Sequence, residues 1–384
     1  MKQKKAISTE TFVVLFGVVG GFVALGRVMG TANLFNTIMN TAHDLLLNTV
    51  FFIMSISVVT GALASLMAEF GVIALMNKFI SPLMRPLFGL PGAASLGIVS
   101  TFLSDNPAVL TLANNENFSK YLKKYQVPAL CNLGTSSGMG MILATYMMGL
   151  GVEGVIGATF VGILGAVIGS VISVRLLTKA TRKHYGISKE EFRADCSMKA
   201  DRGMEEEMRT VTGSAPERAL NSLLEGGKTG VQMGLDIIPG VLVICTFVMI
   251  LTFGPSASGV YTGAAYEGVA LLPKFGELVA PLTNVLFGFR DASNIAFPIT
   301  SMGTTGAAMA LVPQMLETGA AGLNEIAVFT AIGTCWSGYL STHISIMDAL
   351  KERKFIKDAI VSHTIGGLCA GIAAHYIFAL ISLL

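Results

Sequence analysis

The sequence is poor in charged side chains. Asp, Glu, Lys and Arg make up only 13% of its 384 residues, whereas 52% are hydrophobic. Soluble proteins carry about 25% charged residues, so half that fraction predicts an all-α, polytopic membrane protein. The net charge is only +2, and this leaves no excess basic surface for a nucleic-acid partner.

Cysteine is also scarce, and motifs for catalysis are missing. The five Cys form no CxxC pair and have no His at metal-ligand spacing, which argues against a disulfide framework or a zinc site. The sequence has no Walker loop, HExxH motif or nucleophile elbow, so no enzyme activity is expected. The cysteines, expected to be small core residues, are Cys131, Cys196, Cys245, Cys335 and Cys369.

Apolar runs of about 20 residues, the length that spans a bilayer, are abundant. The basic N-terminus precedes the first run without an Ala-x-Ala cleavage site, so we expect a retained first helix with a cytoplasmic N-terminus. Residues 70–90 and 264–288 are amphipathic and interrupted by proline, which indicates helices lying at the interface. Each leads into a segment rich in Ser, Thr, Asn and Gly, at 91–115 and 290–315, that we expect to form a re-entrant hairpin. The seven predicted spans are 9–30, 44–67, 127–150, 153–178, 229–254, 325–348 and 358–384.

The distribution of Lys and Arg supports two hairpins that do not cross. With both hairpins re-entrant, all but three of the 26 basic residues fall on the cytoplasmic side, in agreement with the positive-inside rule. The exceptions are Arg27, Lys274 and Arg290. The polar segment between the two halves is then a cytoplasmic linker.

An internal repeat is visible at an offset of 199 residues. The sequence SPLMRPLFG at 81–89 aligns with APLTNVLFG at 280–288, and the same register continues without a gap to Thr135 and Thr334. The predicted topology inverts one half relative to the other, and inverted repeats with discontinuous helices are typical of secondary transporters. We therefore divide the chain into an extra helix (1–35), a first repeat (36–178), the linker (179–220) and a second, inverted repeat (221–384).

The first hairpin contains a polar run that ends in proline. Pro107 has no amide proton and disfavours helix at the preceding residue, so free backbone groups are expected there. Asp105 would be an ionisable group at membrane depth, where such groups usually line a pathway; alternatively, it caps a helix in water. The predicted solute ligands of this hairpin are Ser104, Asp105 and Asn106.

The second hairpin is rich in hydroxyl groups around its expected tip at 300–306. Hydroxyls and exposed backbone suit a polar uncharged solute or a bare cation, although small residues also favour close helix packing. Arg290 and Asp291 at the entrance either pair with each other or act as a gate. The predicted solute ligands here are Asn294, Thr300, Ser301, Thr304 and Thr305.

A polar cluster interrupts the span that follows each hairpin. Such clusters are costly in a membrane unless they line a cavity or find partners. Unwound carbonyls with amide and hydroxyl oxygens suit sodium, whereas plain hydrogen bonding between helices is the alternative. His343 and Asp348 are candidates for a proton relay or have a structural role. The predicted sodium ligands are Asn132, Thr135, Ser136, Thr334 and Ser337.

The order of these elements resembles a known superfamily over about residues 40–384. It is similar to the Gate-domain (nucleoside recognition) proteins, which include concentrative nucleoside transporters and the spore maturation proteins A and B. The run at 104–107, Ser-Asp-Asn-Pro, resembles the Gln-Thr-Glu run before Ala-Pro in the transporters. The run at 294–297, Asn-Ile-Ala-Phe, keeps the Asn of their Asn-Glu-Phe motif and lacks its Glu.

The sequence and the resemblance together predict a secondary transporter in the inner membrane. Its solute, a nucleoside-like compound or another small polar metabolite, is expected between the hairpin tips, with sodium or protons as the coupling ion. The resemblance implies a homo-oligomer surrounded by lipid. Two alternatives remain open: a membrane assembly factor similar to the spore maturation proteins, and a cation channel in which Asp105 sets selectivity.

Overall fold

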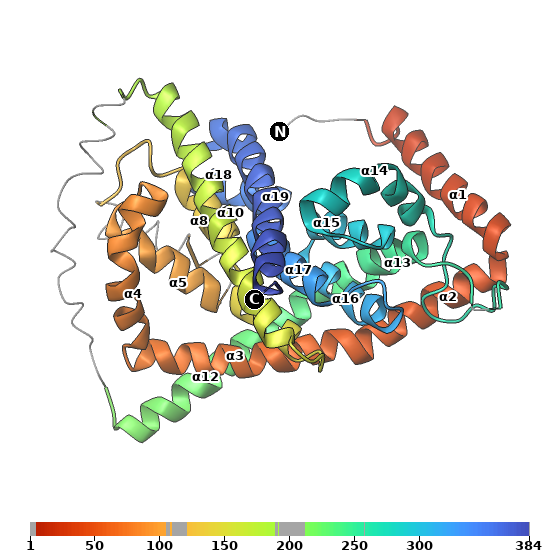
Figure 1. Ribbon diagram of the computed structural model, residues 1–384, viewed down its shortest axis with the longest axis horizontal. Coiled ribbons are helices and arrows are strands. Elements are labelled where there is room, and N and C mark those ends of the chain that lie inside the picture. The colour runs from red at the N-terminus through yellow and green to blue at the C-terminus, as the bar shows by residue number, and fades with distance from the viewer. Residues whose placement is uncertain are drawn as a thin grey trace.

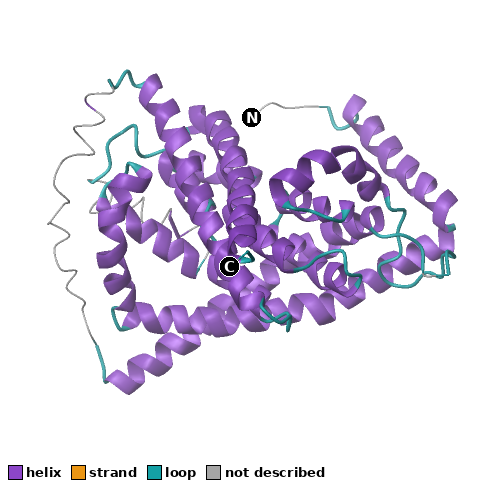
Figure 2. Cartoon of the chain, in the orientation of Figure 1, coloured by secondary structure: helices purple, strands orange, loops and turns teal. Residues whose placement is uncertain are grey.

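All regular elements of the described chain are helices. The computed structural model describes residues 5–104, 108–109, 121–188, 191, 212–256 and 258–383, apart from the side chain of Ser341, and these ranges contain no strand (Figure 2). The predicted all-α class is confirmed. Asp105, Asn106 and Cys196 lie outside the described residues.

Five helices within the described ranges are long and apolar enough to cross a membrane. Two of these helices are longer than the predicted spans 44–67 and 229–254. Each of the two continues without interruption through a short π-helical segment, η1 or η4. The five are α1 (Thr9–Met29), α2–η1–α3 (Thr31–Asp44, Leu45–Val50, Phe51–Glu69), α10 (Val155–His184), α12–η4–α13 (Ala215–Pro239, Gly240–Cys245, Thr246–Thr252) and η6–α19 (Arg353–Phe355, Ile356–Ile381).

The predictions of continuous spans at 127–150 and 325–348 are wrong. The first run forms α8 (Ala129–Thr135) and α9 (Gly140–Met148), and the second forms α17 (Leu323–Cys335) and α18 (Leu340–Ala349). Each pair is separated by a non-helical break, at 136–139 and 336–339. The breaks coincide with the polar clusters, where Ser hydroxyls compete for the helical backbone hydrogen bonds and a glycine disfavours helix through its conformational freedom.

The amphipathic stretches are helical over residues 72–88 and 271–287, whereas 264–270 of the predicted second stretch is a loop, and each helix ends at a glycine. In the first repeat, α4 (Val72–Leu83) and η2 (Met84–Phe88) meet η3 (Gly92–Ala94) and α5 (Ser95–Leu103) at an angle of 109°. In the second, α14 (Leu271–Phe287) leads into η5 (Ala292–Ile295) and α15 (Ala296–Ser301), and α16 (Thr305–Glu317) returns. Gly89 and Gly288 end the amphipathic helices with φ values of 70° and 69°, a conformation that favours glycine.

The 199-residue offset recurs in the element bounds from α4 onward. Val72 begins α4 and Leu271 begins α14, and the helices end at Phe88 and Phe287. Upstream the register shifts, because residues 253–270 separate α13 from α14, whereas only Phe70 and Gly71 separate α3 from α4. Two predictions stay predictions: that the halves are inverted relative to each other, and that the chain divides into four parts. The predicted boundary between the extra helix and the first repeat, at residue 35, falls within α2.

Two helix pairs join the halves of the chain through glycine. In Figure 1, α10 and α19 run side by side through the centre, and α12 crosses α3. A Cβ on Gly230 of α12 would lie 2.2 Å from the carbonyl oxygen of Ser57, and one on Gly169 of α10 would lie 2.4 Å from that of Gly366. Backbones approach this closely only where side chains are absent, as in transmembrane helix pairs with small residues. The hairpins and the two helix breaks are positioned on this framework.

Candidate functional site

The two helix breaks contact each other. At the first break, the amides of Ser136 and Gly138 still bond to carbonyls of α8, and Met139 then adopts a φ of 55° before α9 begins. At the second, the amide of Gly338 leaves its own helix and donates to the carbonyl of Thr135, at 3.3 Å. The hydroxyl of Ser337 donates to the same carbonyl at 3.0 Å. One backbone oxygen of the first repeat therefore receives two hydrogen bonds from the second.

The first hairpin contacts the break of its own repeat. Thr101 lies near the end of α5, and its hydroxyl is 2.7 Å from the hydroxyl of Ser137. Both side chains are buried. One hydroxyl donates to the other, and the second donates to a carbonyl one helical turn back, that of Gly97 for Thr101 or that of Leu133 for Ser137. Hairpin and break are thus joined by a pair of hydroxyls.

The second hairpin contacts the other break through Thr305. This residue begins α16, directly after the turn at 302–304, and is 1% exposed. Its hydroxyl lies 3.2 Å from the carbonyl oxygens of both Gly333 and Trp336. The end of α17 thereby finds a donor for carbonyls that its own helix leaves unpaired.

Helix α10 supplies hydroxyls to the first break. Ser170 lies 2.6 Å from the hydroxyl of Ser136, and Ser173 accepts a hydrogen bond of 2.9 Å from the side-chain amide of Asn132. Asn132 also donates to the carbonyl of Ala359 in α19, at 3.1 Å. The break and the end of α8 that precedes it are therefore bonded to both helices of the central pair.

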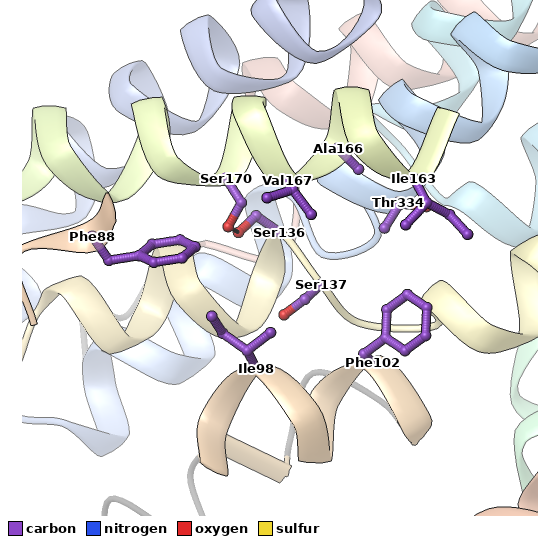
Figure 3. Close-up of a pocket in the computed structure, with 10 residues that line it drawn as sticks. All are labelled: Phe88, Ile98, Phe102, Ser136, Ser137, Ile163, Ala166, Val167, Ser170 and Thr334. Atoms are coloured by element: carbon purple, nitrogen blue, oxygen red, sulfur yellow. Dashed lines mark hydrogen bonds between the residues drawn. The ribbon is translucent and has the colours of Figure 1, made fainter. Parts of the chain in front are cut away.

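A cavity of about 60 Å³ lies between the first break, α5 and α10. Figure 3 shows the hydroxyls of Ser136 and Ser170 turned toward each other, with Phe88, Ile98 and Phe102 around the opposite side. Thr334, at the end of α17 just before the second break, reaches the same cavity. A cavity needs only about 10–15 Å³ per water and typically 300 Å³ or more for an organic ligand. This one has room for a few waters or a small cation.

Several buried oxygens around the breaks and the second hairpin lack a hydrogen-bond partner. The side-chain oxygens of Asn132 and Thr334 lie at the breaks, and those of Asn294 and Ser301 lie in the hairpin. Buried polar atoms are normally paired, so unpaired oxygens gathered in one region are candidates for a functional role. Neutral oxygens of this kind suit a sodium ion or a polar solute.

The site carries no formal charge in its described part. The two breaks and the cavity contain no Asp, Glu, Lys or Arg side chain, and the described residues include no group of three or more His, Cys, Asp or Glu that could hold a metal. Cys131 and Cys335 flank the breaks as buried free thiols. The arrangement can bind by hydrogen bonds and oxygen coordination, and its described side chains include no cation that would pair with an anion.

The structure brings together part of the predicted site. Thr135 and Ser337 are hydrogen-bonded across the breaks, Ser136 and Thr334 line one cavity, and Thr305 bonds to the second break. The remaining described candidates bond elsewhere or not at all. Ser104 bonds to Ser100, Thr300 to Ala296 and Asn294 to Ala320. Thr304 packs against Gly240, and the hydroxyl of Ser301 has no hydrogen-bond partner.

At the entrance to the second hairpin, Asp291 takes a role that neither alternative foresaw. Its carboxylate accepts hydrogen bonds from the amide and the hydroxyl of Ser293, at 2.8 and 2.6 Å. It therefore caps η5, and no ion pair with Arg290 occurs in the described part of the chain.

Sequence reasoning missed Thr101, Ser170 and Ser173. Thr101 aligns with Thr300 at the 199-residue offset of the repeat, and this identity alone does not indicate a contact with the break. The α10 serines are three residues apart in a span otherwise rich in Gly, Ala and Val, a pattern that also fits plain helix packing. The sequence does not show that these serines face the polar break, because their orientation depends on tertiary contacts.

No family model matches the chain, and neither does any curated protein sequence. Solved structures of CNTnw, a concentrative nucleoside transporter, do share its fold. A doubly substituted form in an outward-facing state is 17% identical with a TM-score of 0.53, covering 99% of this chain and 94% of that one. An inward-facing substrate-bound state is 16% identical with a TM-score of 0.51, covering 97% and 94%. The chain therefore has the fold of a concentrative nucleoside transporter.

Proposed function

We propose that this chain is a secondary membrane transporter for a small, uncharged polar solute. The observation that carries the proposal is the contact of two broken helices at one carbonyl, that of Thr135, with a hairpin bonded to each break. Discontinuous helices at a repeat interface are where secondary transporters bind solute and coupling ion. The shared fold with CNTnw adds support, since that protein is a transporter and not an enzyme.

The chemistry of the site limits the solute class. Its described polar side chains are mainly hydroxyls, amides and thiols, so hydrogen bonding to neutral groups is the expected mode of recognition. The run Asn294–Phe297 has no carboxylate that could accept hydrogen bonds from the vicinal hydroxyls of a ribose. We therefore favour a nucleoside-like compound or another polar metabolite whose recognition does not require a ribose. The coupling ion is sodium at the unpaired oxygens of Asn132 and Thr334, or a proton.

Solute binding requires a hairpin to move in this proposal. The cavity of about 60 Å³ is too small for an organic solute. The hydroxyl of Thr101 joins the first hairpin to the first break, and that of Thr305 joins the second hairpin to the second break. Loss of either contact would let the hairpin move away and enlarge the space beside its break. Alternating access then consists of one hairpin moving against the glycine-packed pairs α3–α12 and α10–α19.

Thermal stability of the purified protein tests this function. The panel is nucleosides, nucleobases, neutral amino acids and small carboxylates, each measured in sodium and in choline buffer. A ligand that binds the folded state raises the melting temperature by mass action. We expect one neutral class to stabilise the protein and the carboxylates to have no effect.

Two variants connect the ligand response to the site. Ser137→Ala removes a hydroxyl at the first break and should weaken the response, whereas Ser55→Ala, an exposed hydroxyl bonded only within α3, should preserve it. Absence of a response across the panel in both buffers would contradict the transporter and favour the assembly factor. Sodium currents without any solute response would favour the channel.

A further inference from the structure

The C-terminal end of α10 carries a row of basic side chains beside a second cavity. This cavity has a volume of about 270 Å³, and its described lining comes from α10 alone. Three of the five lining side chains are basic, and none is acidic. The lining residues are Arg175, Leu176, Thr178, Lys179 and Arg182.

The basic row begins where the hydrocarbon core of a bilayer would end. Between Glu153 and Arg175 the chain has 21 consecutive uncharged residues, nearly all of them in α10. A transmembrane helix needs about 20 residues to cross the core, so Arg175 comes at its boundary. Lys179 and Arg182 follow one and two helical turns later, at the depth of lipid headgroups. The positive-inside rule predicts that this end of α10 faces the cytoplasm.

Arg175 is fixed in place by the backbone of the first repeat. Its Nε donates to the carbonyl of Leu87 at 2.7 Å, and its Nη2 donates to that of Pro86 at 2.5 Å, with a longer contact of 3.4 Å to that of Arg85. A guanidinium has five N–H donors, and the two on Nη1 have no acceptor in the described part of the chain. The side chain is thus positioned by three carbonyls while one of its nitrogens is available to a ligand.

The row of like charges is unfavourable without an anion. Arg175 and Lys179 are four residues apart, a spacing at which like charges destabilise a helix. The helix dipole favours cations only in the last turn, which contains Arg182 but neither Arg175 nor Lys179. No carboxylate of the described residues forms an ion pair with Lys179. An anion in the cavity would relieve this repulsion.

The same face of α10 is apolar and exposed along the membrane core. Phe160, Leu164 and Ile168 are exposed and follow one another at intervals of four residues. Val171 continues this stripe to Arg175 at helical spacing. Exposed apolar side chains at this depth contact lipid chains, which are as apolar as leucine. One helix face therefore offers a surface for acyl chains directly beside cations at headgroup depth.

We propose that this end of α10 binds one anionic phospholipid, whose phosphate contacts Arg175 and Lys179 and whose chains lie along the apolar stripe. Phosphate oxygens accept hydrogen bonds from the Nη1 of Arg175 and from the ammonium group of Lys179. Basic pockets at the cytoplasmic ends of transmembrane helices bind such headgroups. A soluble phosphate shares this chemistry but has no chains for the stripe, so the lipid fits both parts of the site. The inference does not depend on the proposed transport function.

The lipid would also strengthen the connection of α10 to the first hairpin. The carbonyls that Arg175 holds belong to the last turn of η2, directly before Gly89, where the amphipathic helix ends. A phosphate beside Arg175 screens it from the charge of Lys179 and leaves these bonds intact. Because the lipid binds the folded chain, it also raises the melting temperature by mass action.

Native mass spectrometry of the full chain in detergent tests the site. The probes are phosphatidylglycerol, which is anionic, phosphatidylcholine, whose phosphate is balanced by its own choline, and inorganic phosphate. We expect one phosphatidylglycerol to bind saturably and at least about fivefold more tightly than phosphatidylcholine. Inorganic phosphate at millimolar concentration should not displace it.

A matched pair of variants locates the lipid on the helix. Lys179→Gln should weaken phosphatidylglycerol binding about fivefold, the effect of one basic residue at an anionic membrane surface. Lys183→Gln removes the same charge four residues later, from an exposed side chain that does not line the cavity, and should bind as the wild type does. Both side chains are exposed, so both variants should melt as the wild type does without lipid.

Three results would overturn the proposal. These are equal binding of the two lipids, an equal effect of Lys179→Gln and Lys183→Gln, and displacement of the lipid by inorganic phosphate, which would assign the cavity to a soluble anion. The neutral-solute panel for the transport function probes the region of the breaks. A solute response without lipid selectivity therefore contradicts only the lipid site, and lipid selectivity without a solute response contradicts only the transporter.

Discussion

Gly226 of α12 lies directly against Gly61 of α3, so that a Cβ on Gly226 would be 2.2 Å from the Gly61 carbonyl oxygen. No side chain fits there without moving backbone. The neighbouring Gly227 differs: its Cβ would meet only a methyl of Val58, at an ordinary 3.6 Å. The two adjacent glycines therefore allow a matched test of the helix crossing.

Gly226→Ala is expected to lower stability by about 1–3 kcal/mol or more, because overpacking forces the helices apart. Gly227→Ala should be neutral or stabilising by up to about 1 kcal/mol, since alanine favours helix. Melting temperatures of both variants in the same detergent measure the difference. Equal effects would mean that α3 and α12 do not cross at Gly61.

Thr305→Val should destabilise the second break. The hydroxyl serves two carbonyls, at 3.2 Å each, and its loss leaves buried acceptors unpaired at a cost of about 1–3 kcal/mol. Thr305→Ser keeps the hydroxyl and should recover most of the loss. Thr318→Val, at the exposed end of the same helix, should change stability by less than about 0.5 kcal/mol. The comparison is made by thermal denaturation.

Glu267 is expected to make stability depend on acidic pH. This carboxylate lies in the loop between α13 and α14, where burial opposes its ionisation. Hydrogen bonds from the hydroxyl and amide of Thr262 and from the amides of Gly263 and Ala264 outweigh burial and lower its pKa. A lowered folded-state pKa contributes stability above the unfolded value, about 4.3, that is lost as pH falls through the folded value.

The acid limb of a melting curve series from pH 7 to 3 checks this expectation. The wild type should lose melting temperature below about pH 4.3, and Glu267→Gln should be less stable at pH 7 with a flatter acid limb. Glu277→Gln, an exposed position on α14, should follow the wild type. Parallel acid limbs for wild type and Glu267→Gln would show that the loop carboxylate is not held by these bonds.

Trp336 is the single tryptophan of the chain and is 2% exposed. Its emission in detergent should be that of a buried indole, with little quenching by acrylamide, because its N–H bonds to His363 and its ring packs on Tyr339. Ready quenching in the folded protein would show that the second break is open to solvent. The unfolded chain in denaturant gives the reference for full access.

The sequence predicted the positions of the breaks better than their nature. Polar clusters at Asn132–Gly138 and Thr334–Gly338 were recognised, yet the runs around them were read as whole helices, because an average over 20 residues hides a four-residue interruption. The C-terminal ends of the amphipathic helices were predicted closely, since Gly89 and Gly288 end them in both halves, whereas the start of the second was predicted seven residues too early. Local sequence could not reveal that Gly338 donates to Thr135, because such pairing is decided by how distant helices pack.

Two buried histidines, His343 and His363, illustrate the same limit, because their ring centroids lie 4.5 Å apart. His343 and His363 are 20 residues apart on different helices, and nothing in the intervening sequence requires their rings to meet. Conversely, Ser104 was predicted as a ligand from its neighbours, and its hydroxyl bonds to Ser100 one turn back. Side chains near a helix end have local carbonyls within reach, and these often satisfy them first.

The glycine-packed pairs also bear on how the chain is made. Helix α3 is synthesised before its partner α12, and α10 before α19. While the second half is still unmade, Gly61 and Gly169 have no backbone against them, and lipid chains fill such narrow grooves poorly. The first half therefore enters the membrane as an incomplete folding unit, and co-expression of the two halves as separate chains should yield stable protein only when both are present.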